Sequence, residues 1–107
     1  MSDSIPSETE VLEAVLKPLL EDFVYWFERS LTLLKSERID FLTEAEQKDL
    51  LTRISQAHQQ AKATQTLFQA TDGQAGVDTA VIKKWHRLVA EGWQVSIRHR
   101  LEHPEET

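Results

Sequence analysis

The chain of 107 residues contains no cysteine, which excludes disulfide bonds, thiolate metal sites and a thiol nucleophile. Glycine and proline occur only three times each, so a fold built from many tight turns, such as a β-sandwich, is not expected. The longest apolar run is the five residues 23–27, far short of the roughly 20 residues that cross a membrane. The N-terminus also has no basic, apolar stretch typical of a secretory signal.

The charge balance is acidic, because 12 Lys and Arg residues stand against 18 Asp and Glu residues, a formal net charge of −6. Attraction to phosphates requires basic surface, so a generic nucleic-acid binder is not expected. The 40% hydrophobic content is too high for a disordered chain and sufficient for one core. The length favours a single domain.

Three stretches combine helical spacing of apolar residues with recognisable ends. The first runs from a capping box opened by Ser7 to about residue 38, and Pro18 inside it predicts a kink or a break after residue 16. The second runs from a capping box at Thr43 to about residue 70, where a left-handed Gly73 would close it. The third starts after its N-cap Asp78 and ends at about residue 103.

Helices of this length joined by short connections lie antiparallel to one another. The sequence therefore predicts an all-α fold, an elongated antiparallel three-helix bundle, with a proline kink near Pro18 in the first helix. The bundle would form one domain over residues 7–103, between a disordered N-terminus (1–6) and a mobile acidic tail (104–107). No strand alternation and no internal repeat competes with this interpretation.

Each expected helix has an apolar stripe when its residues are placed at about 100° intervals. The apolar arc of the first helix is the widest, because Trp26 and Leu33 extend one edge of it, while Tyr25 lies on the opposite side. Gly92 predicts a close helix contact. The first stripe comprises Leu12, Leu16, Leu19, Leu20, Phe23, Phe27, Leu31 and Leu34; the second Leu50, Leu51, Ile54, Ala57, Ala61, Thr64 and Phe68; the third Val81, Trp85, Leu88, Val89, Gly92, Trp93 and Ser96. One layer is expected to hold Phe23, Phe27, Ala57, Ala61, Gly92 and a tryptophan.

The most specific chemical motif is H-x-x-E-H, formed by His99, Glu102 and His103, which matches the zinc signature of inverted zincins. Only four residues follow it, so a downstream third ligand is not available, and we expect a helix end whose cations suit the helix dipole. A metal site there, or one using His58 and His86, is a weaker alternative. No E-x-x-H motif, phosphate loop or G-x-S-x-G occurs. We therefore predict no metal, no cofactor, no small-molecule site and no enzymatic activity.

Charge is distributed unevenly along the chain. Residues 1–46 hold eleven acidic and four basic residues, whereas the third helix is basic, although Arg87–Glu91 and Arg98–Glu102 are spaced to pair locally. The first helix could neutralise the third inside the bundle, or the basic residues could face a partner. The basic residues of the third helix are Lys83, Lys84, Arg87, Arg98 and Arg100.

Five segments carry a further signal: PLLEDFVYWF at 18–27, ERIDFLTE at 37–44, AGVDTA at 75–80, WH at 85–86 and GWQV at 92–95. They resemble the small cyanobacterial family called domain of unknown function 2605, over about residues 10–100. The resemblance implies a cyanobacterial cell and a cytoplasmic location. It carries no activity, cofactor or catalytic residue.

We therefore expect a non-enzymatic interaction module that binds a protein partner or a second copy of itself, because aromatic residues at a surface are common interface anchors. Attachment to an anionic membrane surface through the basic third helix is a second hypothesis. A bundle that binds a small ligand or metal is a third. The expected partner-binding residues are Tyr25, Trp26, Leu33, Lys83 and Arg87.

Overall fold

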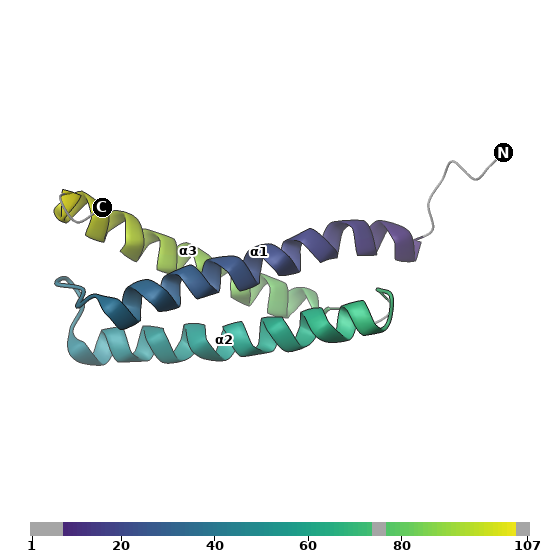
Figure 1. Cartoon of the computed structure of the whole chain (residues 1–107), viewed down its shortest axis with the longest axis horizontal. Helices are drawn as coiled ribbons and strands as arrows, with labels where there is room; N and C mark the ends of the chain where they lie inside the picture. The colour runs from purple at the N-terminus through teal and green to yellow at the C-terminus, as the bar shows by residue number, and fades with distance from the viewer. Residues whose placement is uncertain (1–7, 74–76, 105–107) are drawn as a thin grey trace.

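A computed structural model of the chain describes residues 8–73 and 77–104. Three α-helices follow one another along the chain: α1 (Glu8–Ser36), α2 (Glu44–Ala70) and α3 (Thr79–Glu102). The molecule measures 59 × 24 × 20 Å. The predicted elongated all-α bundle is thus confirmed (Figure 1).

Helix α1 packs against both other helices, more extensively against α2 than against α3. Helix α2 runs back alongside α1, and α3 crosses behind α1 and diverges from α2 toward its C-terminal end (Figure 1). Within the described ranges, no helix is long and apolar enough to cross a membrane. The structure does not describe the expected Ser7 cap, the side chain of Leu12, residues 1–6, which were expected to be disordered, or the part of the expected tail beyond residue 104.

Helix α1 continues through Pro18, so the predicted alternative of a break after residue 16 is wrong. Proline removes the backbone donor that would bond the carbonyl of Ala14. Both Pro18 and Ala14 are exposed, and water can therefore hydrate the carbonyl that loses its partner. The kink at Pro18 stays a prediction.

The helix ends follow the local signals. Thr43 Oγ1 accepts a hydrogen bond from the Glu46 amide at 3.0 Å, and Glu46 Oε1 accepts one from the Thr43 amide at 2.8 Å, which completes the capping box. Gly73 is left-handed with φ +81°, and its amide donates to the Phe68 carbonyl at 2.8 Å. Asp78 Oδ1 accepts from the Ala80 amide at 2.8 Å. These three predicted caps are confirmed.

The core lies where the three helices meet. Its buried positions on α2 and α3 are spaced mostly by three and four residues, the a/d spacing of packed helices. Trp85 is 1% exposed and meets Phe23 edge-on, with 5.5 Å between ring centroids. Ile39, in the α1–α2 connection, is fully buried and was not predicted. The buried apolar residues are Leu20, Phe23, Phe27, Leu31, Leu34, Ile39, Leu50, Ile54, Ala57, Ala61, Phe68, Trp85, Leu88 and Val95.

Gly92 makes the close helix contact that was predicted, but at a different level. A Cβ added there would lie 2.7 Å from Ser30 Oγ and 3.7 Å from Ile54 Cδ1. Gly92 is therefore about one turn closer to the α1–α2 connection than the expected level of Ala57.

The predicted position of Trp93 in the core is wrong, because its side chain is 45% exposed. Helix α3 instead buries Trp85, Leu88, Gly92, Val95 and His99. The side chains of adjacent helical residues point in directions about 100° apart around the helix axis. Because Gly92 faces α1, Trp93 therefore points to the side. The divergence of α3 (Figure 1) leaves that side uncovered.

Candidate functional site

A groove of about 700 Å³ lies between the C-terminal halves of α1 and α3. Both walls use residues spaced at helical intervals of three and four, so each wall is one continuous helix face. The lining residues on α1 and directly after it are Trp26, Arg29, Ser30, Thr32, Leu33, Ser36 and Glu37, and those on and directly after α3 are Trp93, Ser96, Ile97, His99, Arg100 and His103.

Aromatic side chains from both helices meet at one end of this α1–α3 groove. Trp26 and Trp93 contact each other edge-to-face, with 4.9 Å between ring centroids. Tyr25 lies edge-on to Trp26 at 5.0 Å. The Arg29 guanidinium lies 5.7 Å and 5.8 Å from the Tyr25 and Trp26 ring centroids, and its Nη1 donates to the Tyr25 hydroxyl at 3.0 Å. This stacking fixes a cation beside the aromatic end of the groove.

The apolar surface continues along α3. Ile97 lines the groove and is 49% exposed, and Leu101 next along the same face is 75% exposed. Trp93, Ile97 and Leu101 are four residues apart, so they form one stripe. Across the groove, Leu33 of α1 is partly buried. The molecule thus exposes several large apolar side chains on one hollowed face, a feature typical of interaction surfaces.

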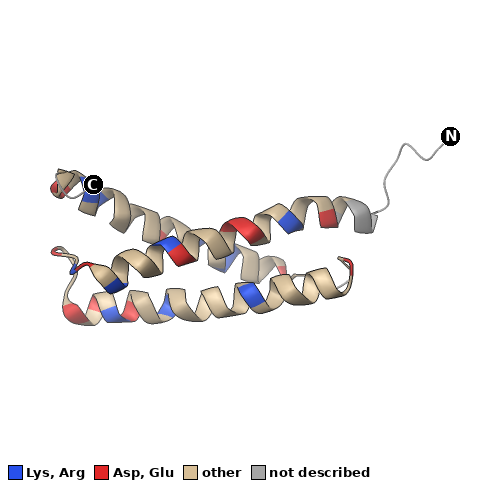
Figure 2. Ribbon diagram, viewed as in Figure 1, with Lys and Arg blue, Asp and Glu red and all other residues tan. Residues whose placement is uncertain are grey.

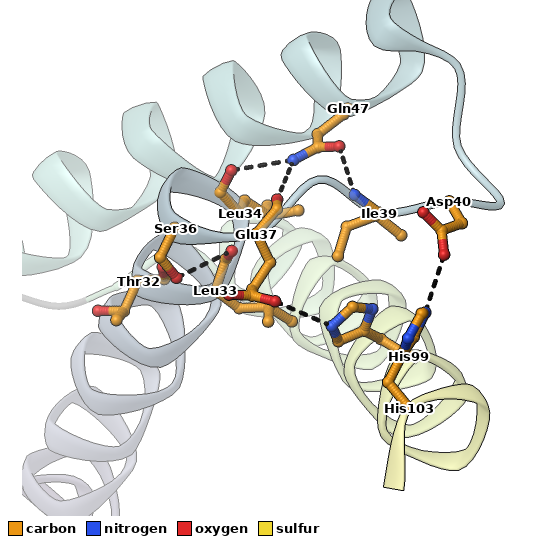
Figure 3. Close-up of polar contacts among 10 residues, drawn as sticks. All are labelled: Thr32, Leu33, Leu34, Ser36, Glu37, Ile39, Asp40, Gln47, His99 and His103. Carbon is orange, nitrogen blue, oxygen red and sulfur yellow. Dashed lines mark hydrogen bonds and ion pairs between the residues drawn. The ribbon is translucent and has the colours of Figure 1, made fainter. Parts of the chain in front are cut away.

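Two histidine–carboxylate contacts bound the other end of the groove (Figure 3). His99 Nε2 lies 3.6 Å from Glu37 Oε1, and His103 Nε2 lies 2.8 Å from Asp40 Oδ2. The two imidazole rings are 4.7 Å apart. Since Glu37 and Asp40 belong to the α1–α2 connection, these contacts join the end of α3 to that connection.

Gln47, the fourth residue of α2, holds the same connection through both atoms of its amide (Figure 3). Its Nε2 donates to the carbonyls of Leu34 and Glu37 at 3.0 and 2.8 Å. Its Oε1 accepts from the Ile39 amide at 3.0 Å and from Arg38 Nη1 at 2.8 Å. The side chain therefore satisfies carbonyls that α1 leaves without helical donors at its C-terminus.

The residues of the H-x-x-E-H motif do not converge on one point. His99 and His103 face Glu37 and Asp40, whereas Glu102 accepts a hydrogen bond from Arg98 Nε at 2.9 Å. Within the described part of the chain, no group of three or more His, Asp and Glu residues could hold a metal ion.

The other two histidines are far from that motif. His58 is partly buried, and its Nε2 lies 3.1 Å from Glu28 Oε2, so it is a hydrogen-bonded packing residue. His86 is exposed. These two positions therefore form separate environments on α2 and α3.

Lys and Arg residues, blue in Figure 2, occur along α3, and the described ion pairs neutralise only some of them. The predicted Arg98–Glu102 pair is confirmed at 2.9 Å. The predicted Arg87–Glu91 pair is wrong, because Glu91 pairs with Arg53 of α2, Nη2 to Oε2 at 2.9 Å. The hydrogen bonds that Arg53 donates to Glu91, first, and to Asp49 of α2 raise the pKa of Arg53. Among the residues described, no Lys or Arg of α3 forms an ion pair with a carboxylate of α1.

The structure brings three of the five expected partner-binding residues to one place. Trp26 and Leu33 line the α1–α3 groove, and Tyr25, 49% exposed, packs on Trp26 beside it. Arg87 lines a different, smaller groove of about 260 Å³ between α2 and α3. Lys83 is exposed and lines neither groove.

The groove residues that α3 contributes were not among the predicted partner-binding residues. Trp93 was placed in the core, and Ile97 was not singled out. Arg100 was counted only as one of several bases. The signal that could have found them is the i, i+4, i+8 stripe of Trp93, Ile97 and Leu101, which lies beside the buried stripe and makes the apolar arc of α3 wider than one neighbour covers.

Comparison with protein families matches residues 6–101 to the family described as a protein of unknown function, DUF2605. The family resemblance expected from the sequence is thereby confirmed. No curated protein and no solved structure matches the chain.

Proposed function

The chain belongs to the DUF2605 family of proteins of unknown function, and we propose that it is a non-enzymatic module that binds one helix of a partner protein in its α1–α3 groove. One observation carries this proposal: Trp26 and Trp93 meet across the groove while Trp93 stays 45% exposed. Tryptophan is among the residues that contribute most to binding when a partner covers it.

The shape of the groove favours a helix as the bound element. Its α1 wall extends from Trp26 to Glu37 and its α3 wall from Trp93 to His103, which is about 15–17 Å of helix at 1.5 Å per residue. Three turns of a partner helix have that length. Amphipathic helices commonly bind in grooves through apolar residues spaced i, i+3 or i+4, and i+7.

The proposal keeps the cytoplasmic location and the cyanobacterial cell expected from the sequence. Peripheral membrane attachment stays the second hypothesis, after binding of a partner protein. The exposed residues Trp93 and Ile97 line a hollow between two helices, which suits a rod-shaped ligand better than the flat surface of a bilayer.

Site-specific photo-crosslinking in the native cell tests the proposal. A photoreactive phenylalanine analogue replaces Ser96 inside the groove or, as a matched control, exposed Gln59 on α2. We expect the groove position alone to cross-link to one partner segment, which mass spectrometry identifies as an amphipathic helix. The cross-link should disappear in Trp93→Ala, whose fold is checked by circular dichroism.

Two results would contradict the proposal. One is the same set of cross-linked proteins from both positions, or none from the groove position. The other is a cross-link that persists at full yield in a folded Trp93→Ala variant. Static light scattering of the purified chain separates a third case, in which the cross-linked partner is a second copy.

A further inference from the structure

We infer that the partner helix is acidic, with carboxylates on both flanks of its apolar face, placed to meet Arg29 on one wall of the groove and Arg100 on the other. This inference rests on the proposed function and specifies the chemistry of the partner. It starts from the charges that border the groove rather than from its apolar residues.

Arg29 and Arg100 are the two arginines that line the groove, one from each helix. Within the described ranges, neither forms an ion pair with a carboxylate. Arg29 donates to the Tyr25 hydroxyl at 3.0 Å and lies over two aromatic rings. The acidic lining residue, Glu37, already faces His99 at 3.6 Å. The groove therefore presents two cations that pair with no carboxylate of the described residues.

Covering these cations with an apolar or basic helix would remove them from water without compensation, which is unfavourable. A partner carboxylate would replace the lost water with a charge-assisted hydrogen bond. Arg29 requires little ordering for this purpose, because the Tyr25 hydroxyl and the rings already hold its guanidinium. Charge complementarity therefore selects an acidic ligand.

The positions of the two arginines also define the spacing of the carboxylates. Trp26 meets Trp93 at one end of the groove, and Glu37 meets His99 at the other. Arg29 lies near the first contact and Arg100 near the second. Because these contacts are eleven residues apart along α1 and six along α3, the two arginines lie about one to two helical turns apart along the groove. The partner helix should carry one carboxylate on each flank at roughly that separation, with large apolar residues between them.

A second copy of this chain fits the groove less well. A symmetric dimer formed through this face would bring both arginines of each copy into one interface. Among the described residues that line the groove, the one carboxylate that could offset them, Glu37, already faces His99. Like charges brought together in an interface disfavour association.

The inference is tested with three synthetic, side-chain-stapled helical peptides that share one apolar face of leucines. Their flanking positions carry glutamate, glutamine or lysine. Fluorescence anisotropy with the full chain should give the tightest binding for the glutamate peptide, weaker binding for the glutamine peptide and the weakest for the lysine peptide. The preference for glutamate should decrease as salt is added, since exposed charges are screened.

Arg29→Gln and Arg100→Gln should each weaken binding of the glutamate peptide about fivefold, which corresponds to the roughly 1 kcal/mol that an exposed ion pair contributes. Neither substitution should change the affinity for the glutamine peptide. Arg87→Gln is the matched control, because it removes the same charge from the smaller α2–α3 groove, and we expect it to leave all three affinities unchanged.

Several results would overturn the inference while leaving the proposed function in place. They are equal binding of the glutamate and glutamine peptides, an equal effect of Arg87→Gln, failure of all three peptides to bind, or a cross-linked partner segment that is net basic. A dimer that Trp93→Ala dissociates would also overturn it, because a second copy would then fill the groove. The proposed function is decided separately by the cross-linking experiment.

Discussion

At the residue scale, the side chain of Gln47 connects two helices through one amide. It donates to two carbonyls at the end of α1 and accepts from the Ile39 amide and from Arg38. The Ile39 side chain is fully buried beside it, so the amide fixes the path by which this residue enters the core. Gln47 thereby also positions Glu37 and Asp40, the two carboxylates that face the end of α3.

We predict that Gln47→Ala lowers the free energy of unfolding by about 2–3 kcal/mol, because several partly buried backbone groups lose their partners at once. Urea denaturation followed by circular dichroism measures the change. Gln59→Ala, an exposed residue of the same helix, is the control and should change stability by less than about 0.5 kcal/mol. Similar losses in the two variants would show that the amide network contributes little.

At the element scale, α2 contributes two buried alanines to the core. Ala57 and Ala61 are 4% and 0% exposed, and large rings from the other helices, among them Phe23, Phe27 and Trp85, occupy the same core. Small side chains on one helix allow the others to approach closely. The fit of α1 and α3 on α2 therefore depends on the volume of these two alanines.

Ala61→Leu should lower the free energy of unfolding by about 1–3 kcal/mol, because extra methyl groups force neighbours in a filled core to move. Leucine and alanine are both good helix formers, so intrinsic propensity does not account for such a loss. Ala63→Leu, at an exposed position of α2, provides the matched control. An Ala61→Leu variant as stable as the control would mean that α2 is not closely packed there.

The helix ends could be predicted from the sequence because the signals are local. Thr43 with Glu46, Gly73 and Asp78 each act on backbone groups within five residues. The rotation of α3 about its own axis could not be predicted from the sequence. Gly92 and Trp93 are neighbours, and only the position of α1 decides which of them faces the core. His99 was missed as a buried residue for the same reason.

The candidate site was predictable only on α1. The wide apolar arc of that helix identified Trp26 and Leu33, which line the groove. Lys83 and Arg87 were chosen for charge alone, and charge does not reveal which face a residue occupies. The groove lies between the C-terminal halves of α1 and α3, and the way α3 crosses α1 (Figure 1) is a property of tertiary packing that residue spacing does not encode.

At the scale of the whole molecule, the chain is long and thin. Its radius of gyration is 17.1 Å, whereas a compact domain of this length has a value of about 13 Å. Three helices of 29, 27 and 24 residues lie side by side instead of folding into shorter segments. Such a shape gives a small protein enough length to hold several turns of another helix.

Small-angle X-ray scattering should give a radius of gyration near 17 Å at a molecular mass of 12.3 kDa. The value should not change with protein concentration if the chain is a monomer. A value near 13 Å would contradict the extended bundle. A mass that doubles with concentration would instead indicate self-association, and the groove variant Trp93→Ala would show whether this face is responsible.

The three tryptophans have a practical consequence for spectroscopy. Trp85 is 1% exposed in the core, whereas Trp26 and Trp93 form a surface pair. Acrylamide should quench the emission of the surface pair while sparing the buried indole. An incoming ligand would shield the pair from the quencher, so occupancy can be followed in the unlabelled protein, with the interior fluorophore as an internal standard.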